Sequence, residues 1–105
     1  MATELIGGVE VHVDDEGFMT DPSEWNEELA PALAKGIGID DLSEGHWKVI
    51  RFLREDFAQE GTTATLRRVS TMAGVPTKEL YQLFPKKPAK KMSYVSGLQK
   101  PVGCV

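Results

Sequence analysis

The stretch SEGHWKVIRFLREDF, residues 43–57, carries the longest helical pattern in the chain and decides the fold class. Its apolar residues recur at helical spacing, which predicts one amphipathic helix. Asp41 or Ser43 is expected to cap its start. Arg51, Arg54 and Glu55 are expected on the wetter side. The stripe expected to face the core consists of Trp47, Ile50, Leu53 and Phe57, widened by Val49 and Phe52.

Two shorter helical patterns follow, one ending at Gly74 and one opening at Pro76. Joined by the turn at 73–75, they resemble the helix-turn-helix of bacterial transcription regulators. If they bound DNA, Thr77, Lys78 and Gln82 would face a major groove, and Arg67, Arg68, Lys86 and Lys87 would meet phosphates. The favoured alternative is packing alone, because this helix pair is a common structural unit.

The first 20 residues predict a small antiparallel meander. Val9, Val11 and Val13 alternate with polar residues, as in a half-buried strand. The turn at 15–17 allows a return strand through Phe18 and Met19. A further short piece is expected before Val9, around Ile6.

A helix is then expected to begin at residues 21–24, Asp-Pro-Ser-Glu, a typical helix start. Trp25, Leu29 and Leu33 would share its apolar face. Pro31 is expected to kink this helix or end its first part. The glycines at positions 36 and 38 are expected to stop it.

Length and composition predict one domain, residues 1–105, without a membrane span. The N-terminus has no signal-peptide pattern, so the cytoplasm is the expected compartment. The chain holds one cysteine and two histidines, which excludes an internal disulfide and argues against a structural metal. We expect no cofactor.

Charge is divided unevenly along the chain. Residues 1–60 carry a formal charge of −11 and residues 61–105 carry +7. Either the basic half meets an anionic partner, or the two halves attract each other, and charge alone does not decide between them.

The C-terminal segment, residues 85–105, contains three prolines, two glycines and five lysines. It predicts one short helix near 88–96 and a mobile arm over 97–105. Cys104 lies near the end of that arm, where a thiol could enter a partner's active site. The alternative is an incidental exposed thiol. Residues expected to bind a partner are Lys86, Lys87, Lys90, Lys91, Lys100, Pro101 and Gly103.

His46 offers a second hypothesis for chemistry, a catalytic pair with Cys104. A flexible arm would hold that geometry poorly, so the pair is disfavoured. His12 alternates with the valines and is expected on the open face of its strand.

Several stretches together resemble the DsrC/TusE family over nearly the whole chain. The most specific is the ending with its penultimate cysteine. The matching stretches are Leu83-Phe84-Pro85, Pro88-Ala89-Lys90, Gly97-Leu98, Lys100-Pro101-Val102-Gly103-Cys104-Val105, Asp15-Glu16-Gly17-Phe18 with Trp25, and His46-Trp47 with Ile50 and Phe52-Leu53-Arg54.

The resemblance implies an α+β, mainly helical fold, in which the β-meander packs on about five helices over 21–96. It implies a sulfur carrier, at most a sulfurtransferase, with sulfane sulfur held as a persulfide on Cys104. Expected partners are a TusBCD/DsrEFH-like donor and a tRNA thiolase or sulfite reductase acceptor, with indirect tRNA contact and a monomeric state. The alternatives are a gamma-type docking subunit of dissimilatory sulfite reductase and a DNA-binding protein.

The sequence departs from the family pattern at two positions. Ser93 stands where two-cysteine members have a second cysteine, eleven residues before the penultimate one, and Gln99 stands where proline is usual. A bridge between two cysteines of one chain is therefore impossible, which favours a one-cysteine relay of the TusE type.

Overall fold

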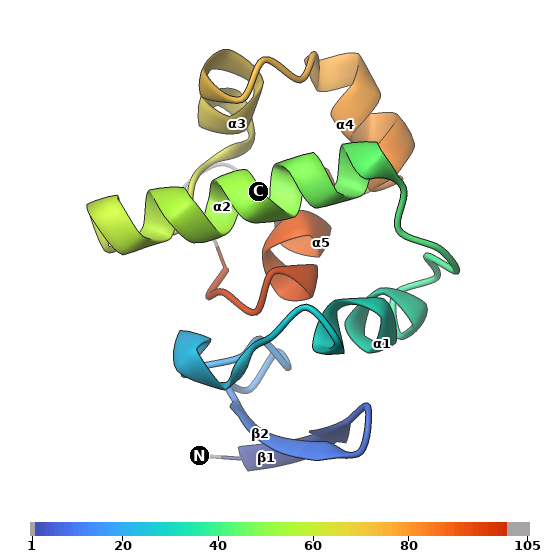
Figure 1. Ribbon diagram of the computed structural model, residues 1–105, viewed down its shortest axis with the longest axis vertical. Coiled ribbons are helices and arrows are strands. Elements are labelled where there is room, and N and C mark those ends of the chain that lie inside the picture. The colour runs from blue at the N-terminus through green and yellow to red at the C-terminus, as the bar shows by residue number, and fades with distance from the viewer. Residues whose placement is uncertain (1, 101–105) are drawn as a thin grey trace.

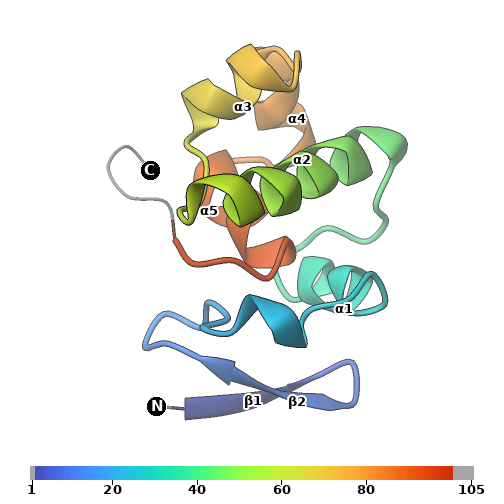
Figure 2. The ribbon, with the colours of Figure 1, turned by 60° about the vertical axis from the view of Figure 1, so that its left-hand side comes forward.

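An N-terminal β-hairpin lies at one end of the molecule and the helices stack on it in layers (Figures 1 and 2). The computed structural model describes residues 2–100. Within them, the predicted α+β, mainly helical class is confirmed. The elements are β1 (Ala2–Ile6), β2 (Val9–Val13), the 3-10 helix η1 (Pro22–Glu24), α1 (Leu29–Lys35), α2 (Glu44–Glu60), α3 (Leu66–Met72), α4 (Thr77–Leu83) and α5 (Pro88–Val95). None of the helices in this part of the chain is long and apolar enough to cross a bilayer.

The hairpin turns at Gly7 and Gly8, whose φ angles of 57° and 83° suit a two-residue loop. Its inner face buries Val11 and Val13, and His12 lies on the open face as predicted. The return strand is reduced to a single bridge between Val13 and Met19. The predicted meander is therefore a two-stranded hairpin with one additional bridge.

The helix expected to start at residue 22 is interrupted. Asp21 caps only the 3-10 turn, and the backbone becomes extended at Trp25, with ψ of 143°. The Asn26 side chain then accepts the backbone N–H groups of Glu28 and Leu29, and α1 begins. Pro31 falls in the first turn of α1, where an N–H has no helical partner, so it produces no kink.

Helix α2 begins at its predicted cap, Ser43, and ends at Gly61 in the left-handed conformation. Val49, Ile50 and Leu53 are fully buried against α3 and α5. The predicted stripe faces the core, because Trp47, Phe52 and Phe57 are half-buried and pack against it beside these three residues. Two polar residues that the stripe did not include, His46 and Asp56, are also buried.

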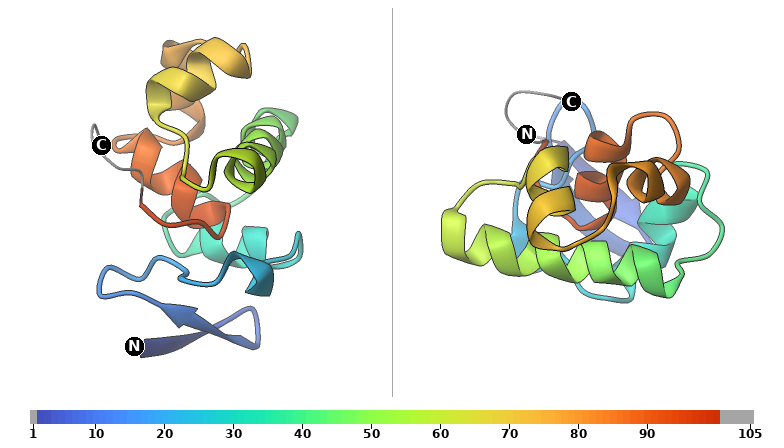
Figure 3. Two further views of the ribbon diagram at one scale, coloured as in Figure 1. Left: turned by 90° about the vertical axis from the view of Figure 1, so that its left-hand side faces the viewer. Right: turned by 90° about the horizontal axis from the view of Figure 1, so that it is seen from above.

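Helix α5 forms the centre of the helical array and contacts α1, α2 and α4. Seen from above, α3 and α4 lie over α5 and α2 runs along one side (Figure 3). The main core includes Leu80, Phe84 and Met92, none of them exposed. Trp25 and Tyr94 pack against both this core and the smaller core under the hairpin, so they join the two layers.

The boundary predicted at residue 97 falls inside the packed part of the chain. Gly97 is buried and Leu98 is fully buried in the main core. Pro101, Gly103 and Cys104 lie outside the described residues.

Candidate functional site: the root of the C-terminal arm

Residues 97–100, here called the arm root, are tied to the folded body. The hydroxyl of Thr63 donates a 2.8 Å hydrogen bond to the carbonyl of Gln99. Lys100 forms an ion pair with Glu16, with 3.1 Å between Nζ and Oε2. The chain leading to Cys104 is therefore anchored up to residue 100.

Trp25 and Arg54 support the arm root from beneath. The Arg54 guanidinium lies 4.4 Å from the Trp25 ring centroid. It donates hydrogen bonds to the carbonyls of Ser96, at 3.1 Å, and Pro22, at 3.0 Å. Trp25 donates its indole N–H to the carbonyl of Val95 at 2.9 Å. Burial lowers the pKa of Arg54, and its expected place on the wetter side of α2 is wrong.

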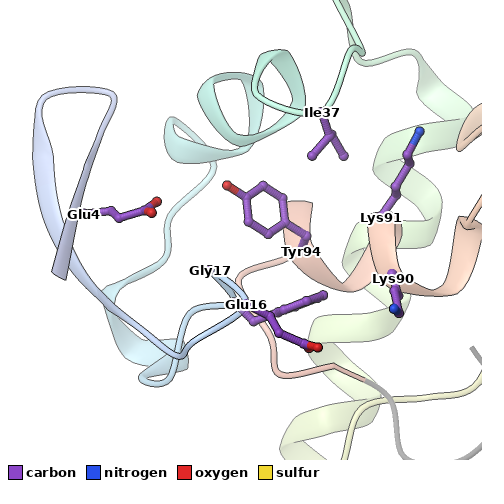
Figure 4. A pocket seen from close by; sticks show the side chains of 8 residues that line it. Glu4, Glu16, Gly17, Ile37, Lys90, Lys91 and Tyr94 are labelled. Atoms are coloured by element: carbon purple, nitrogen blue, oxygen red, sulfur yellow. The ribbon is translucent and has the colours of Figure 1, made fainter. Parts of the chain in front are cut away.

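A pocket of about 300 Å³ lies beside the arm root, between the hairpin side and α5 (Figure 4). Phe18 and Tyr94 meet edge to face in it, with ring centroids 5.8 Å apart. The tyrosine hydroxyl is directed toward Glu4. Burial and then this carboxylate raise the pKa of Tyr94. The pocket is lined by Glu4, Glu16, Gly17, Phe18, Ile37, Lys90, Lys91 and Tyr94.

The structure brings four of the predicted partner-binding lysines together at the start of α5. Lys86 and Lys87 are exposed in the preceding loop, and Lys90 and Lys91 are half-buried in the first turn. Lys100 lies apart from them, beyond the other end of α5, in its ion pair with Glu16. These four lysines are called the basic face below.

The predicted helix-turn-helix is present as α3 and α4, which contact each other. Arg68, one of the two arginines expected to meet phosphates, instead binds the buried Asp56 at 2.7 Å, and this hydrogen bond raises the pKa of Arg68. Thr77 donates its hydroxyl to Ser70 at 3.3 Å. Lys78 and Gln82 are exposed. Packing alone stays the prediction for this helix pair, and DNA binding stays the alternative.

His46 has a structural role that sequence reasoning missed. Its Nδ1 accepts the backbone N–H of Ser43 at 3.0 Å and its Nε2 lies 2.7 Å from the carbonyl of Leu83. The ring therefore links the start of α2 to the end of α4 and has no free nitrogen for a catalytic pair with Cys104.

Ser93, at the position of the second cysteine in two-cysteine relatives, is fully buried in α5. Its hydroxyl donates to the carbonyl of Ala89 at 2.8 Å. The serine that departs from the family pattern is thus buried in the core with its hydroxyl hydrogen-bonded. Among residues 2–100, histidine and acidic side chains form no group of three suited to holding a metal ion.

Comparison with known proteins places the chain among relatives of the same length. A family model described as "DsrC like protein" matches residues 5–105. The chain belongs to this DsrC-like family. The resemblance inferred from the sequence is therefore confirmed.

Two kinds of DsrC-like relative are similar to this chain. A Salmonella typhimurium protein named sulfurtransferase TusE is 41% identical over 108 residues, covering 96% of this chain and 98% of the relative. A crystal structure titled dissimilatory sulfite reductase I (DsrI) has a TM-score of 0.86 and 34% identity, covering 99% of this chain and all of that one. A solution structure of the Pyrobaculum aerophilum DsrC/gamma subunit of dissimilatory sulfite reductase has a TM-score of 0.80 and 36% identity, covering 99% and 95%.

Sequence reasoning singled out the lysines but missed Glu16, Trp25, Arg54 and Thr63. Trp25 and Arg54 are separated by 29 positions, and each has a plausible local role, in an apolar face or on a solvated one. No local pattern signals that they meet. The only hint was that Trp25 and Arg54 both fall in stretches shared with the family.

Proposed function

We propose that this DsrC-like protein is a sulfur relay that carries sulfane sulfur as a persulfide on Cys104. The observation that carries the proposal is the anchored arm root, which the chain's only cysteine follows by four residues. The name of its curated relative, a sulfurtransferase, supports the same role.

The reaction needs no cofactor. The Cys104 thiolate attacks the outer sulfur of a donor persulfide, an S–S bond forms at Cys104, and the donor's S–S bond breaks to leave a donor thiolate. An acceptor thiolate then attacks the outer sulfur on Cys104, and the Cys104 thiolate is released. Because each step exchanges one S–S bond for another, no external oxidant or reductant is required.

The basic face is proposed to dock the donor or acceptor. Four lysines gather at the start of α5, and no acidic residue lies in its first turn. Cations at this end of a helix are disfavoured by the helix dipole. Within residues 2–100, no ion pair offsets them. An acidic or RNA-bearing partner surface would supply the missing negative charge.

The relay hypothesis is tested by intact-mass measurement after incubation with a persulfide donor. The wild-type chain should gain the mass of one sulfur atom and lose it when an acceptor is added. Cys104→Ser should gain nothing. An equal adduct on Cys104→Ser would refute the role of Cys104.

The docking hypothesis is tested by replacing all four lysines of the basic face with glutamine. Loss of electrostatic steering should slow transfer to the protein acceptor by about tenfold at low salt and less at high salt. Alkylation of Cys104 by a small neutral reagent should be unchanged. If the four-glutamine variant transfers sulfur at the wild-type rate at low salt, these lysines are only a solvated surface and do not dock the partner.

Two classes of acceptor are proposed. The family resemblance implies a tRNA thiolation partner in the cytoplasm, and a solved structure titled gamma subunit of dissimilatory sulfite reductase favours sulfite reductase. Pull-down of each candidate by persulfide-loaded protein, with Cys104→Ser as control, distinguishes the two. The single cysteine favours the relay, because no second thiol is present to form a bridge within the chain.

A further inference from the structure

We propose that Trp25, Arg54 and Gly97 form a clamp that fixes the arm root and so limits the space that Cys104 can reach. The clamp deepens the proposed relay function, on which its meaning for sulfur transfer rests. Trp25 and Arg54 would act as positioning residues, since neither contacts the reacting sulfur.

The guanidinium of Arg54 joins segments that are distant in sequence. One nitrogen binds the carbonyl of Ser96, the last residue before the arm root, and another binds Pro22 in η1. Its Cζ atom lies over the Trp25 ring, and the indole N–H in turn donates to the carbonyl of Val95. The end of α5 is therefore held from two sides, by α2 and by the chain after the hairpin.

Gly97 lets the chain leave α5 in close contact with the side chain of Trp25. Its φ is +69°, a conformation that disfavours any side chain. A Cβ at this position would lie 2.4 Å from Cδ1 of Trp25 and 2.6 Å from its Cβ. Only glycine permits this close approach of the backbone to Trp25, so the first residue of the arm root packs directly against the Trp25 side chain.

The clamp has a geometric consequence for Cys104. Four residue steps separate Lys100 from Cys104, so the two Cα atoms lie within about 14 Å of each other. If the arm root were released, eight steps would separate Ser96 from Cys104, and the limit would double to about 28 Å. Doubling a radius enlarges the accessible volume about eightfold and dilutes the thiol by the same factor.

The anchored position also brings the thiol's range close to the basic face. Glu16, the ion-pair partner of Lys100, lines the same pocket as Lys90 and Lys91. For a partner bound at those lysines, the effective concentration of the Cys104 thiol would therefore depend on whether the clamp holds the arm root.

The single cysteine allows the clamp to be tested without sulfur chemistry. A nitroxide attached to Cys104 broadens the amide NMR signals of residues that it approaches. In the wild-type chain, broadening should concentrate near the arm root, at residues such as Glu16, Thr63 and Gln99. In Arg54→Lys, which cannot bind both carbonyls with the same fork, broadening should spread to more distant residues and weaken near the root.

Arg51→Lys is the matched control, because Arg51 also lies on α2 and over a tryptophan, with 5.5 Å to the Trp47 centroid. Its broadening map should equal the wild-type map. An Arg54→Lys map that also equals it would overturn the clamp. If Arg54→Lys loses its dispersed NMR signals, Trp25→Phe, which lacks the indole N–H, decides the question by the same comparison.

Transfer kinetics separate the clamp from the relay itself. Arg54→Lys should slow transfer to a protein acceptor by up to about eightfold, while alkylation of Cys104 by a small neutral reagent keeps its rate. Slower transfer with an unchanged broadening map would contradict the clamp. If broadening spreads in Arg54→Lys and the Cys104→Ser variant still transfers sulfur, the clamp is supported and the relay role of Cys104 is refuted.

Discussion

Two arginine–tryptophan pairs lie along α2, and they differ in what surrounds them. Arg51 lies over Trp47 at 5.5 Å, and its side chain is 64% exposed, with Glu27 at 3.6 Å. Arg54 lies over Trp25 at 4.4 Å, is half-buried, and donates to two backbone carbonyls. The same two side-chain types thus make a solvated surface contact in one place and a half-buried junction in the other.

The difference shows that a cation–π pair gains its importance from what else it binds. An exposed pair is screened by water and contributes little. At the Trp25 junction, the guanidinium also donates to the carbonyls of Ser96, which caps the end of α5, and Pro22, which begins η1, so removing it would leave the Ser96 carbonyl unpaired. The pair at Trp25 therefore has consequences for the arm, and the pair at Trp47 does not.

The largest effect on stability is expected when a side chain is added at Gly97, where there is no space beside Trp25. Gly97→Ala places a methyl group against the Trp25 ring at positive φ, and should lower the free energy of unfolding by about 3 kcal/mol. Gly38→Ala is the control, because Gly38 has φ of +87° and no atom within 4 Å of the added Cβ. It should lower the free energy of unfolding by about 1 kcal/mol, as measured by urea unfolding. Equal effects would show that backbone conformation alone matters at Gly97.

Removing each arginine tests the comparison directly. Arg54→Met removes the donor of the Ser96 carbonyl and one of the two donors of the Pro22 carbonyl, and should lower the free energy of unfolding by about 2–3 kcal/mol. Arg51→Met loses only an exposed contact and should change it by less than about 0.5 kcal/mol. Thermal or urea unfolding of both variants measures the difference. Similar losses for both would show that the two arginines contribute equally to stability.

A smaller effect is expected at the outer end of the arm root. Thr63→Val keeps the side-chain shape but removes the bond to the Gln99 carbonyl, and should lower the free energy of unfolding by about 1 kcal/mol. The neighbouring Thr62 is exposed, so Thr62→Val should have an effect below about 0.5 kcal/mol. Hydrogen exchange at residues 98–100 should also increase in Thr63→Val only. Unchanged exchange there would indicate that Leu98 packing suffices to hold the root.

The smallest effect is expected in the pH dependence of stability. Hydrogen bonds from the backbone N–H of His12 and then from its ring lower the pKa of Glu24 below its usual value of 4.5. The folded state therefore binds fewer protons than the unfolded state near that pH, and this stabilisation is lost as pH falls through the lowered pKa. Glu24→Gln should flatten the fall in unfolding free energy between about pH 5 and pH 3. Glu27→Gln, beside the exposed Arg51, is the control and should keep the wild-type slope.

Local pattern alone determined much of the fold. Ser43 and Gly61 bound α2 because a side-chain cap and a left-handed glycine act within one helical turn. The strand at Val9–Val13 followed from period-two alternation, and the family from the ending around Cys104. The interruption at Trp25 could not be predicted from local pattern. Asn26 and Asp21 are both local candidates for the helix start, and the hydrogen bond of the indole to Val95, 70 positions away, is a tertiary contact.

The sequence by itself therefore determined the elements, the family and the single thiol. The tertiary structure decided which charges are free and which are used: Arg68 and Lys100 are held in ion pairs, while the basic face at the start of α5 is not, among residues 2–100. It also decided that Arg54 and Trp25, 29 positions apart, meet beneath Gly97. The physical reason is that caps and periodicity act over a few residues, whereas burial and hydrogen-bond partners depend on which segments the packed core brings together.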